Sequence, residues 1–193
     1  MSNVKTYIEI KIIDKDGKVV KEVKSEANSF VRNFIRALYN LTIAPAMNRT
    51  ATMLVDIYGR ENPMLFNPRY LYTIMDLVAP IENDDYGILV GRGTNPVSYD
   101  DYELEDQITY LDIYYGEMEG HLISRPDGKE AIVISRTFTN SSSGDVTIRE
   151  VGLAFHTRTI YDRYFFLIDR TVLSSPITLK PGQSAVIRYI ITA

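Results

Sequence analysis

The chain has 193 residues, of which 45% are hydrophobic, with 21 basic and 25 acidic side chains and a formal net charge of −4. This length and composition predict a globular chain that buries a sizeable core without disulfides. The slight acidic excess argues against nucleic acid as a partner, and the absence of cysteine excludes disulfides, thiolate metal sites and cysteine nucleophiles.

The beginning of the chain and its hydropathy argue against a cleaved signal and against a membrane partner. Residues 1–5 lead directly into charged, alternating residues without the apolar segment of a signal peptide. No stretch approaches the ~18 consecutive apolar residues of a spanning helix. We therefore expect synthesis in the cytoplasm. The absence of Cys and Trp beside 14 tyrosines suggests a thermophilic source.

The first predicted elements are a β-hairpin and a helix. Residues 7–13 alternate, with the isoleucines at even positions on one face, and residues 19–23 return after the turn signal Asp16-Gly17. Apolar residues from Phe30 to Leu41 recur at helical spacing and predict a helix that ends at or just before Pro45. The polar residues at 32, 33 and 36 would lie on the opposite face.

Residues 45–80 give no clear pattern, and we interpret them as an excursion that is too short to have its own core. Methionines and aromatic residues are frequent here, and further tyrosines cluster in a later strand. Exposed aromatics can anchor a protein interface or stack on sugars, whereas buried ones fill a core. The candidate interface residues are Met53, Tyr58, Met64, Phe66, Tyr70, Tyr72, Tyr114 and Tyr115.

From residue 86 onward, short strands alternate with turn signals. Strands are predicted at 87–90, 106–115, 130–140, 146–155, 164–171 and 184–192. This pattern predicts a mainly β, antiparallel β-sandwich within a single domain (1–193), comprising the hairpin and helix (1–44), the irregular insertion (45–80) and the sandwich core (81–193). The spacing fits a jelly roll or an immunoglobulin-like sandwich, and we prefer the jelly roll.

No catalytic, cofactor-binding or metal-binding residue is predicted, and no cofactor is expected. His121 and His156 lie far apart in the sequence and lack metal-ligand spacing. Gly91 and Gly93 lack the third glycine of a nucleotide loop, so we expect a strand-ending loop with positive φ. The acidic residues between 100 and 106 are predicted to form a solvated face, with a calcium site as the alternative. Asn140 is the glycosylation sequon best placed for modification, in a predicted exposed loop.

Three segments carry a resemblance when they are taken together. They read GILVGRGT with DYEL (87–104), ISRTFTN with VTIREVGL (134–153), and FLIDR with LKPGQ (166–183). Their order is similar to that in structural proteins of the capsid or tail of tailed phages, and of viruses or proviruses of thermophilic archaea and bacteria. The resemblance covers roughly residues 86–193. Its scaffold motif comprises Gly91, Gly93, Arg149, Glu150, Gly152, Pro181 and Gly182.

The motif residues suit a scaffold, since Gly152 would allow a close backbone approach or a bulge and Pro181-Gly182 would fit a type II turn. The resemblance implies assembly and no reaction, so we expect a non-enzymatic virion protein. Its partners would be copies of itself and other virion proteins, contacted through sheet edges and the 45–80 excursion. The alternatives are a carbohydrate- or receptor-binding sandwich that takes a host-surface glycan, and a cupin-like enzyme that would need a histidine-rich metal site.

Overall fold

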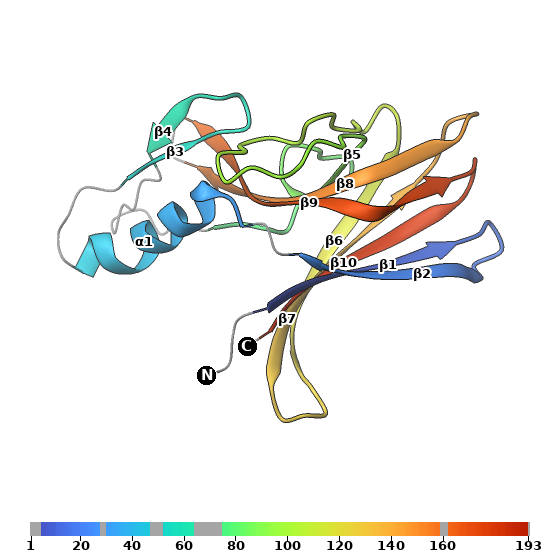
Figure 1. Cartoon of the computed structure of the whole chain (residues 1–193), viewed down its shortest axis with the longest axis horizontal. Helices are drawn as coiled ribbons and strands as arrows, with labels where there is room; N and C mark the ends of the chain where they lie inside the picture. Colours follow the sequence, from blue (N-terminus) through green and yellow to red (C-terminus); the bar gives the residue numbers. More distant parts are fainter. Residues whose placement is uncertain (1–4, 28–29, 47–51, 64–74, 159–161, 193) are drawn as a thin grey trace.

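The structure is a computed structural model that describes residues 5–27, 30–46, 52–63, 75–158 and 162–192. Two antiparallel sheets form a sandwich, one with the strand order β2-β1-β10-β7-β6 and one with the order β5-β8-β9 (Figure 1). A short third sheet pairs β3 with β4. The elements are β1 (Lys5–Ile13), β2 (Val19–Ala27), α1 (Arg32–Ala46), β3 (Met53–Val55), β4 (Glu61–Pro63), β5 (Gly87–Gly91), β6 (Tyr114–Ser124), β7 (Glu130–Thr139), β8 (Val146–Arg158), β9 (Arg163–Leu179) and β10 (Ser184–Thr192).

The predicted mainly β, antiparallel sandwich is confirmed, with α1 as the single helix of the described residues. The strand order does not establish a jelly-roll connectivity, which stays a prediction. The predicted N-terminal hairpin is present, and β2 extends four residues beyond the expected end at 23, to Ala27. Among the described helices, none combines the length and hydrophobicity needed to cross a membrane.

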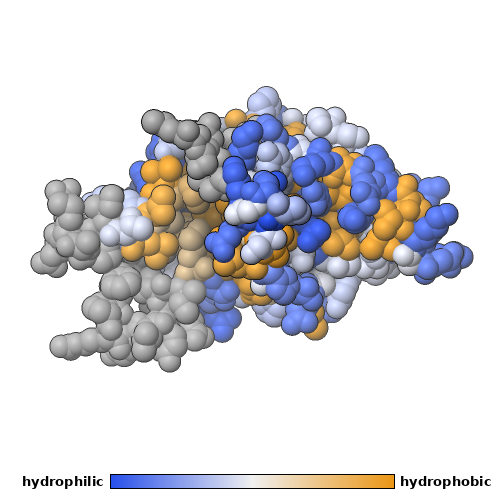
Figure 2. Space-filling view, turned by 90° about the horizontal axis from the view of Figure 1, so that it is seen from below, coloured by the Kyte–Doolittle hydropathy of each residue, from blue (hydrophilic) through white to orange (hydrophobic). Residues whose placement is uncertain are grey.

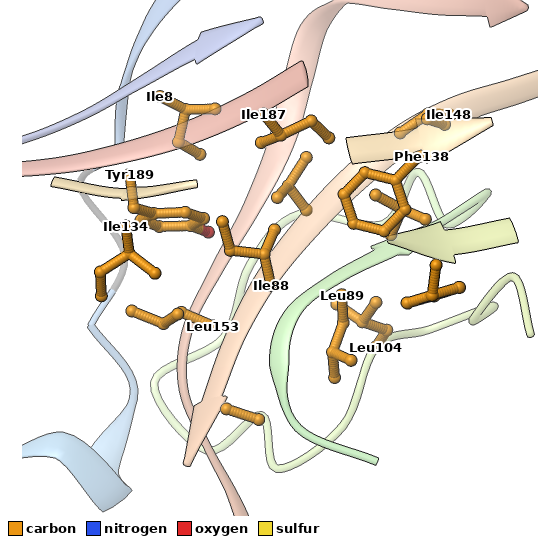
Figure 3. Close-up of a cluster of buried hydrophobic side chains, with 14 of the residues drawn as sticks. Ile8, Ile88, Leu89, Leu104, Ile134, Phe138, Ile148, Leu153, Ile187 and Tyr189 are labelled. Atoms are coloured by element: carbon orange, nitrogen blue, oxygen red, sulfur yellow. The ribbon is translucent and has the colours of Figure 1, made fainter. Parts of the chain in front are cut away.

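Alternating strands supply one wall of the core. In β1 the isoleucines at 8, 10 and 12 are buried between half-exposed neighbours. Ile8 pairs with Tyr189 and Ile10 with Ile187 across the β1–β10 ladder, so the same face of both strands meets the core. Figure 3 shows Ile8, Ile187 and Tyr189 directed toward Ile88 and Leu153 of the other sheet. Each such side chain contributes about 1.5–3 kcal/mol when fully buried.

Strand β5 is short and buried at all five positions. One edge of β5 pairs with β8. At the other edge, Gly91 forms a β-bridge with Gln107 of the following loop, and Ile108 N donates to Val90 O (2.9 Å). The continuous apolar run of β5 is thus explained, because no face of this strand reaches water. Long loops precede and follow β5, and their backbone groups must find partners inside the molecule.

The inward face of the helix only partly matches the predicted apolar stripe: Val31 is buried and Phe34 and Leu41 pack against the core, but two asparagines share this face. Asn33 and Asn40 are buried, whereas Ile35 and Leu38 are about half exposed (53% and 48%). Asn33 donates to Val55 O (2.7 Å) and accepts from Val55 N (3.1 Å). Asn40 exchanges the same pair of hydrogen bonds with Thr52, at 2.8 Å each. The asparagine amides satisfy the edge of β3, so tertiary hydrogen bonding overrides the apolar stripe.

The described part of the 45–80 excursion packs against the rest of the molecule. Leu54 of β3 is fully buried in the core, as is Ala79 near the end of the excursion. The buried Asp56 closes the β3–β4 hairpin by accepting hydrogen bonds from Tyr58 N (3.0 Å) and Arg60 N (2.9 Å). This hairpin is therefore a fixed part of the fold, and a deletion of residues 45–80 would remove core side chains.

Candidate interaction surface and its internal support

Glu150 is the centre of a buried polar network on β8. Its side chain is fully buried, and both carboxylate oxygens are occupied. One oxygen accepts hydrogen bonds from Gly93 N (3.0 Å) and Asp106 N (2.9 Å), and the other accepts from Glu105 N (3.3 Å) and Arg170 Nε (2.8 Å). One carboxylate thus joins two separate parts of the loop that follows β5, at Gly93 and at residues 105–106. A buried charge is tolerated when it is paired and hydrogen-bonded in this way.

Arg170 of β9 extends this network toward the surface. Its guanidinium binds Glu150 and Asp101 at 2.8 Å each, and it reaches Asn95 O at 3.3 Å and Glu105 at 3.5 Å. Burial alone lowers the pKa of Arg170, but the hydrogen bonds to Asp101 and Glu150 outweigh burial and raise that pKa. The acidic stretch was predicted to be a solvated face, yet two of its carboxylates are ligands of a buried arginine.

Arg136 of β7 forms a second buried site, in which backbone carbonyls replace carboxylates. The guanidinium lies 4.6 Å from the centre of the Tyr115 ring. Burial lowers the pKa of Arg136 to about 10, so the side chain keeps its charge at neutral pH. All five of its N–H groups are used. They donate to the carbonyl oxygens of Gly116 (2.9 Å), Tyr86 (3.4 Å), Ile88 (3.2 Å), Pro80 (3.0 Å) and Asn83 (2.7 Å).

The scaffold glycines are explained by this packing. Gly91 and Gly93 were predicted to need positive φ, but neither is among the positive-φ glycines. A Cβ on Gly91 would overlap the Glu150 carboxylate and lie 2.8 Å from the backbone oxygen of Asp106, and a Cβ on Gly93 would lie 2.5 Å from Glu150 Oε1. The prediction of positive φ was wrong, because these glycines make room for a buried carboxylate.

The other motif residues behave as scaffold. A Cβ on Gly152 would lie 2.8 Å from a side-chain carbon of Leu104 and 2.9 Å from one of Leu167, so core side chains fill the space that this glycine leaves. Gly182 has φ +78° and the N–H of Gln183 bonds the carbonyl of Lys180 (3.0 Å), as a type II turn requires. Arg149 is exposed on the opposite side of β8 from Glu150.

The candidate interface residues divide into three groups. Met53, Tyr58 and Tyr114 are exposed, at 39%, 58% and 38%. Tyr115 is fully buried, so its assignment to an interface was wrong: its side chain packs against Phe138 and its hydroxyl donates to Ile108 O. The remaining four lie outside the described residues: Met64, Phe66, Tyr70 and Tyr72.

The β6–β7 hairpin carries an exposed apolar surface that the sequence analysis did not identify. This hairpin projects beyond the sandwich at the bottom of Figure 1. Leu122, Ile123 and Ile132 on its two strands are 67%, 39% and 48% exposed. Figure 2, viewed from that side, shows hydrophobic patches between hydrophilic side chains. Alternation within a strand did not single out these aliphatic residues as exposed, because it does not tell where the opposite sheet ends.

The two histidines and the Asn140 sequon do not form a site. His121 is exposed on β6, and His156 of β8 lies among the rings of Tyr86 and Phe165. The described residues contain no group of three potential metal-ligating side chains. Asn140 is fully buried and donates to Gly144 O and Leu179 O, so the prediction of an exposed sequon was wrong.

Comparisons with known proteins found no match among protein-family models, among curated proteins or among solved structures.

Proposed function

We propose that this chain is a virion structural protein that assembles in a capsid or tail through contacts with its own copies and with other virion proteins. The proposal includes synthesis in the host cytoplasm and no catalytic reaction. The observation that carries it is a group of three exposed apolar side chains on the projecting β6–β7 hairpin, namely Leu122, Ile123 and Ile132. Such a projection suits contacts with neighbours.

The internal networks support the same proposal. Glu150 and Arg170 fix the loop after β5, and Arg136 fixes the segment before it. These residues hold backbone and make no open site, as expected of a module whose surfaces must keep their shape. The motif segments that resemble virion proteins contain Glu150, Arg170 and Arg136, so the resemblance and the packing point to the same scaffold role.

The test is the molar mass of the purified protein by light scattering with size-exclusion chromatography, over a hundredfold range of concentration, together with electron microscopy of the largest species. A defined ring, cage or tube is expected, because virion proteins assemble with closed or helical symmetry. A monomer at every concentration that also fails to join particles reconstituted with its neighbouring virion proteins would refute the proposal.

A glycan-binding module is the second candidate, because exposed tyrosines also occur on the loop before β6 and at the first residue of β6. Tyr110 and Tyr114 are 49% and 38% exposed, and Leu111 between them is 78% exposed. Tyrosine rings with a free face stack on sugars. A glycan array with the wild-type chain and the Tyr110→Ala and Tyr114→Ala variants tests this candidate. Binding that both variants lose would support it, and no binding by the wild type would remove it.

A further inference from the structure

One sheet edge of this protein is open for pairing. Strand β6 is the last strand of the five-stranded sheet, with β7 on its inner side only. Near the body, the segment around residues 79–82 covers its outer side, since Glu82 N bonds Tyr115 O (2.8 Å) and Met118 N bonds Ala79 O (3.4 Å). Farther along, between Glu119 and Ser124, no described residue makes a backbone hydrogen bond to the outer side.

The direction of the free backbone groups follows from two hydrogen bonds. Arg125 N donates to Lys129 O (2.7 Å), on the β7 side, whereas Met118 N donates away from β7. Since direction alternates along a strand, even-numbered residues between them direct their N–H and C=O groups outward. The free groups therefore belong to Gly120, Leu122 and Ser124.

The side chains along this edge add an apolar contact. Leu122 is paired with Ile132 of β7, and the two lie on the same face of the hairpin. They are 67% and 48% exposed, and Ile123 on the other face is 39% exposed. An exposed apolar edge strand is a ready template for another strand.

The opposite edge of the same sheet is different. Most of β2 is exposed on both faces, and between Lys21 and Glu26 it carries lysines and glutamates. Charged side chains on an edge strand discourage pairing. Four of the six side chains between residues 21 and 26 are charged, and the exposed valines of β2 lie at its first two residues. Between residues 119 and 124 of β6, Glu119 is the one acidic side chain, so we choose β6 as the contacting edge.

We propose that β6 pairs antiparallel with β6 of a second copy of this chain, about a two-fold axis at Leu122, so that the two sheets become continuous. This inference rests on the proposed function and names one contact of the assembly. In this register Leu122 faces its own counterpart, and Gly120 faces Ser124 of the second copy. Glu119 then lies opposite Arg125 of the second copy, so the pairing is complementary in charge as well as apolar at its centre.

Neighbouring registers are less complete. A shift toward the body places Ser124 opposite Met118, whose N–H is already bound to Ala79. A shift toward the hairpin tip places Gly120 opposite Pro126, which has no N–H. Only the register centred on Leu122 pairs all three outward residues with one another.

A cysteine cross-link tests the contact in the full chain, which has no cysteine of its own. In the Leu122→Cys variant the two sulfurs would meet across the axis, because directly opposed Cα atoms lie about 5.5 Å apart, within disulfide range. Val20→Cys on the β2 edge is the matched control, with a comparably exposed side chain (51% against 67%). Mild oxidation is expected to convert most Leu122→Cys, and little Val20→Cys, to a covalent dimer. Equal dimer yields for both variants would overturn the proposal.

The Leu122→Lys variant provides an independent measurement. Two like charges at the axis should weaken self-association by roughly tenfold. Because Leu122 is largely exposed, the melting temperature should stay unchanged, which separates loss of contact from loss of fold. If the wild type assembles and Leu122→Lys assembles equally well, this edge contact is wrong and the proposed function stands. If the wild type forms no oligomer and Leu122→Cys forms no dimer, this contact is wrong, and the reconstitution with other virion proteins decides the proposed function separately.

Discussion

Replacement of Glu150 by glutamine tests whether the loop after β5 depends on this carboxylate, because the substitution keeps the size of the side chain and removes its charge and one of its two acceptor oxygens. Each carboxylate oxygen of Glu150 accepts two hydrogen bonds. In glutamine one of the oxygens becomes an NH₂ group, which is a donor and faces two other donors whichever way the amide is turned. Two hydrogen bonds to a charged acceptor are lost, at about 1.5–3 kcal/mol each.

The loss of the buried negative charge leaves Arg170 with two partly exposed charged partners, Asp101 and Glu105. Removal of one member of a buried pair costs about 3–5 kcal/mol, in agreement with the hydrogen-bond estimate. That is a large fraction of the 5–15 kcal/mol by which domains are stable. For a chain of this size, the melting temperature should fall by roughly 10 °C.

Urea denaturation followed by circular dichroism measures the change for Glu150→Gln. The matched control is Glu117→Gln, which makes the same substitution at an exposed position of the sheet edge and should change the free energy of unfolding by less than about 0.5 kcal/mol. If Glu150→Gln costs less than about 1 kcal/mol, the loop after β5 does not depend on this carboxylate, and the structural account of the motif is wrong.

Three further outcomes are expected. Gly91→Ala should cost about 1–3 kcal/mol by overpacking against Glu150, whereas Gly144→Ala, with open space around its Cβ, should be close to neutral in urea denaturation. Arg136→Lys should cost about 3 kcal/mol or more in the same assay, because three N–H donors cannot satisfy five carbonyls. Burial raises the pKa of Tyr115 and of Tyr189. Both tyrosines therefore stabilise the folded state fully below pH ~10, and this stabilisation is lost as the pH rises further. Arg136, whose pKa burial lowers to about 10, has the opposite effect on the pH dependence of stability. Burial also raises the pKa of Tyr58, Tyr86 and Tyr164, so the tyrosines outnumber Arg136 and the free energy of unfolding should fall as the pH rises above about 10. Alkaline denaturation measures this fall, which is absent if the buried tyrosines ionise in the folded protein.

Local periodicity was enough to predict most strands. The alternation of β1, β7 and β10 and the apolar run of β5 are properties of a few neighbouring residues, and they reflect which faces are buried. The turn at Pro181-Gly182 was predicted for the same reason, since glycine at that position permits the required φ.

The supporting network could not be predicted, because its partners are far apart in the sequence. A signal was nevertheless present. Arg136 is in phase with Ile134 and Phe138, which face the core, and Glu150 continues the phase of Ile148. A charged residue in phase with buried apolar residues must find partners inside. The sequence indicates that such partners exist, but not that most of them are backbone groups of residues 80–106.

For the helix, the sequence signal was clear but the prediction of its buried face was only partly right. Its apolar stripe was a sound local pattern, but the strand beside it has an edge that needs donors and acceptors, and the amides of Asn33 and Asn40 supply both. Hydrogen bonds to otherwise unsatisfied backbone outweigh the exposure of Ile35 and Leu38, since a lost bond costs about as much as a buried methyl group or two. The half-exposed aliphatic residues are the consequence of that choice.

The two buried charged side chains bind opposite kinds of backbone group on the two sides of β5, carbonyl oxygens before the strand and N–H groups after it. The segment that precedes and enters β5 directs its carbonyl oxygens inward, and there a guanidinium, which has only donors, receives them through Arg136. The segment that follows β5 directs N–H groups inward, and there a carboxylate, which has only acceptors, receives them through Glu150. Arg136 comes from the five-stranded sheet and Glu150 from the three-stranded sheet. Each sheet therefore fixes the chain at one end of β5. Exchange of either charged side chain for one of opposite charge would leave donors facing donors, or acceptors facing acceptors, at that end. The loops around this short strand are held by matched polarity where the apolar core ends.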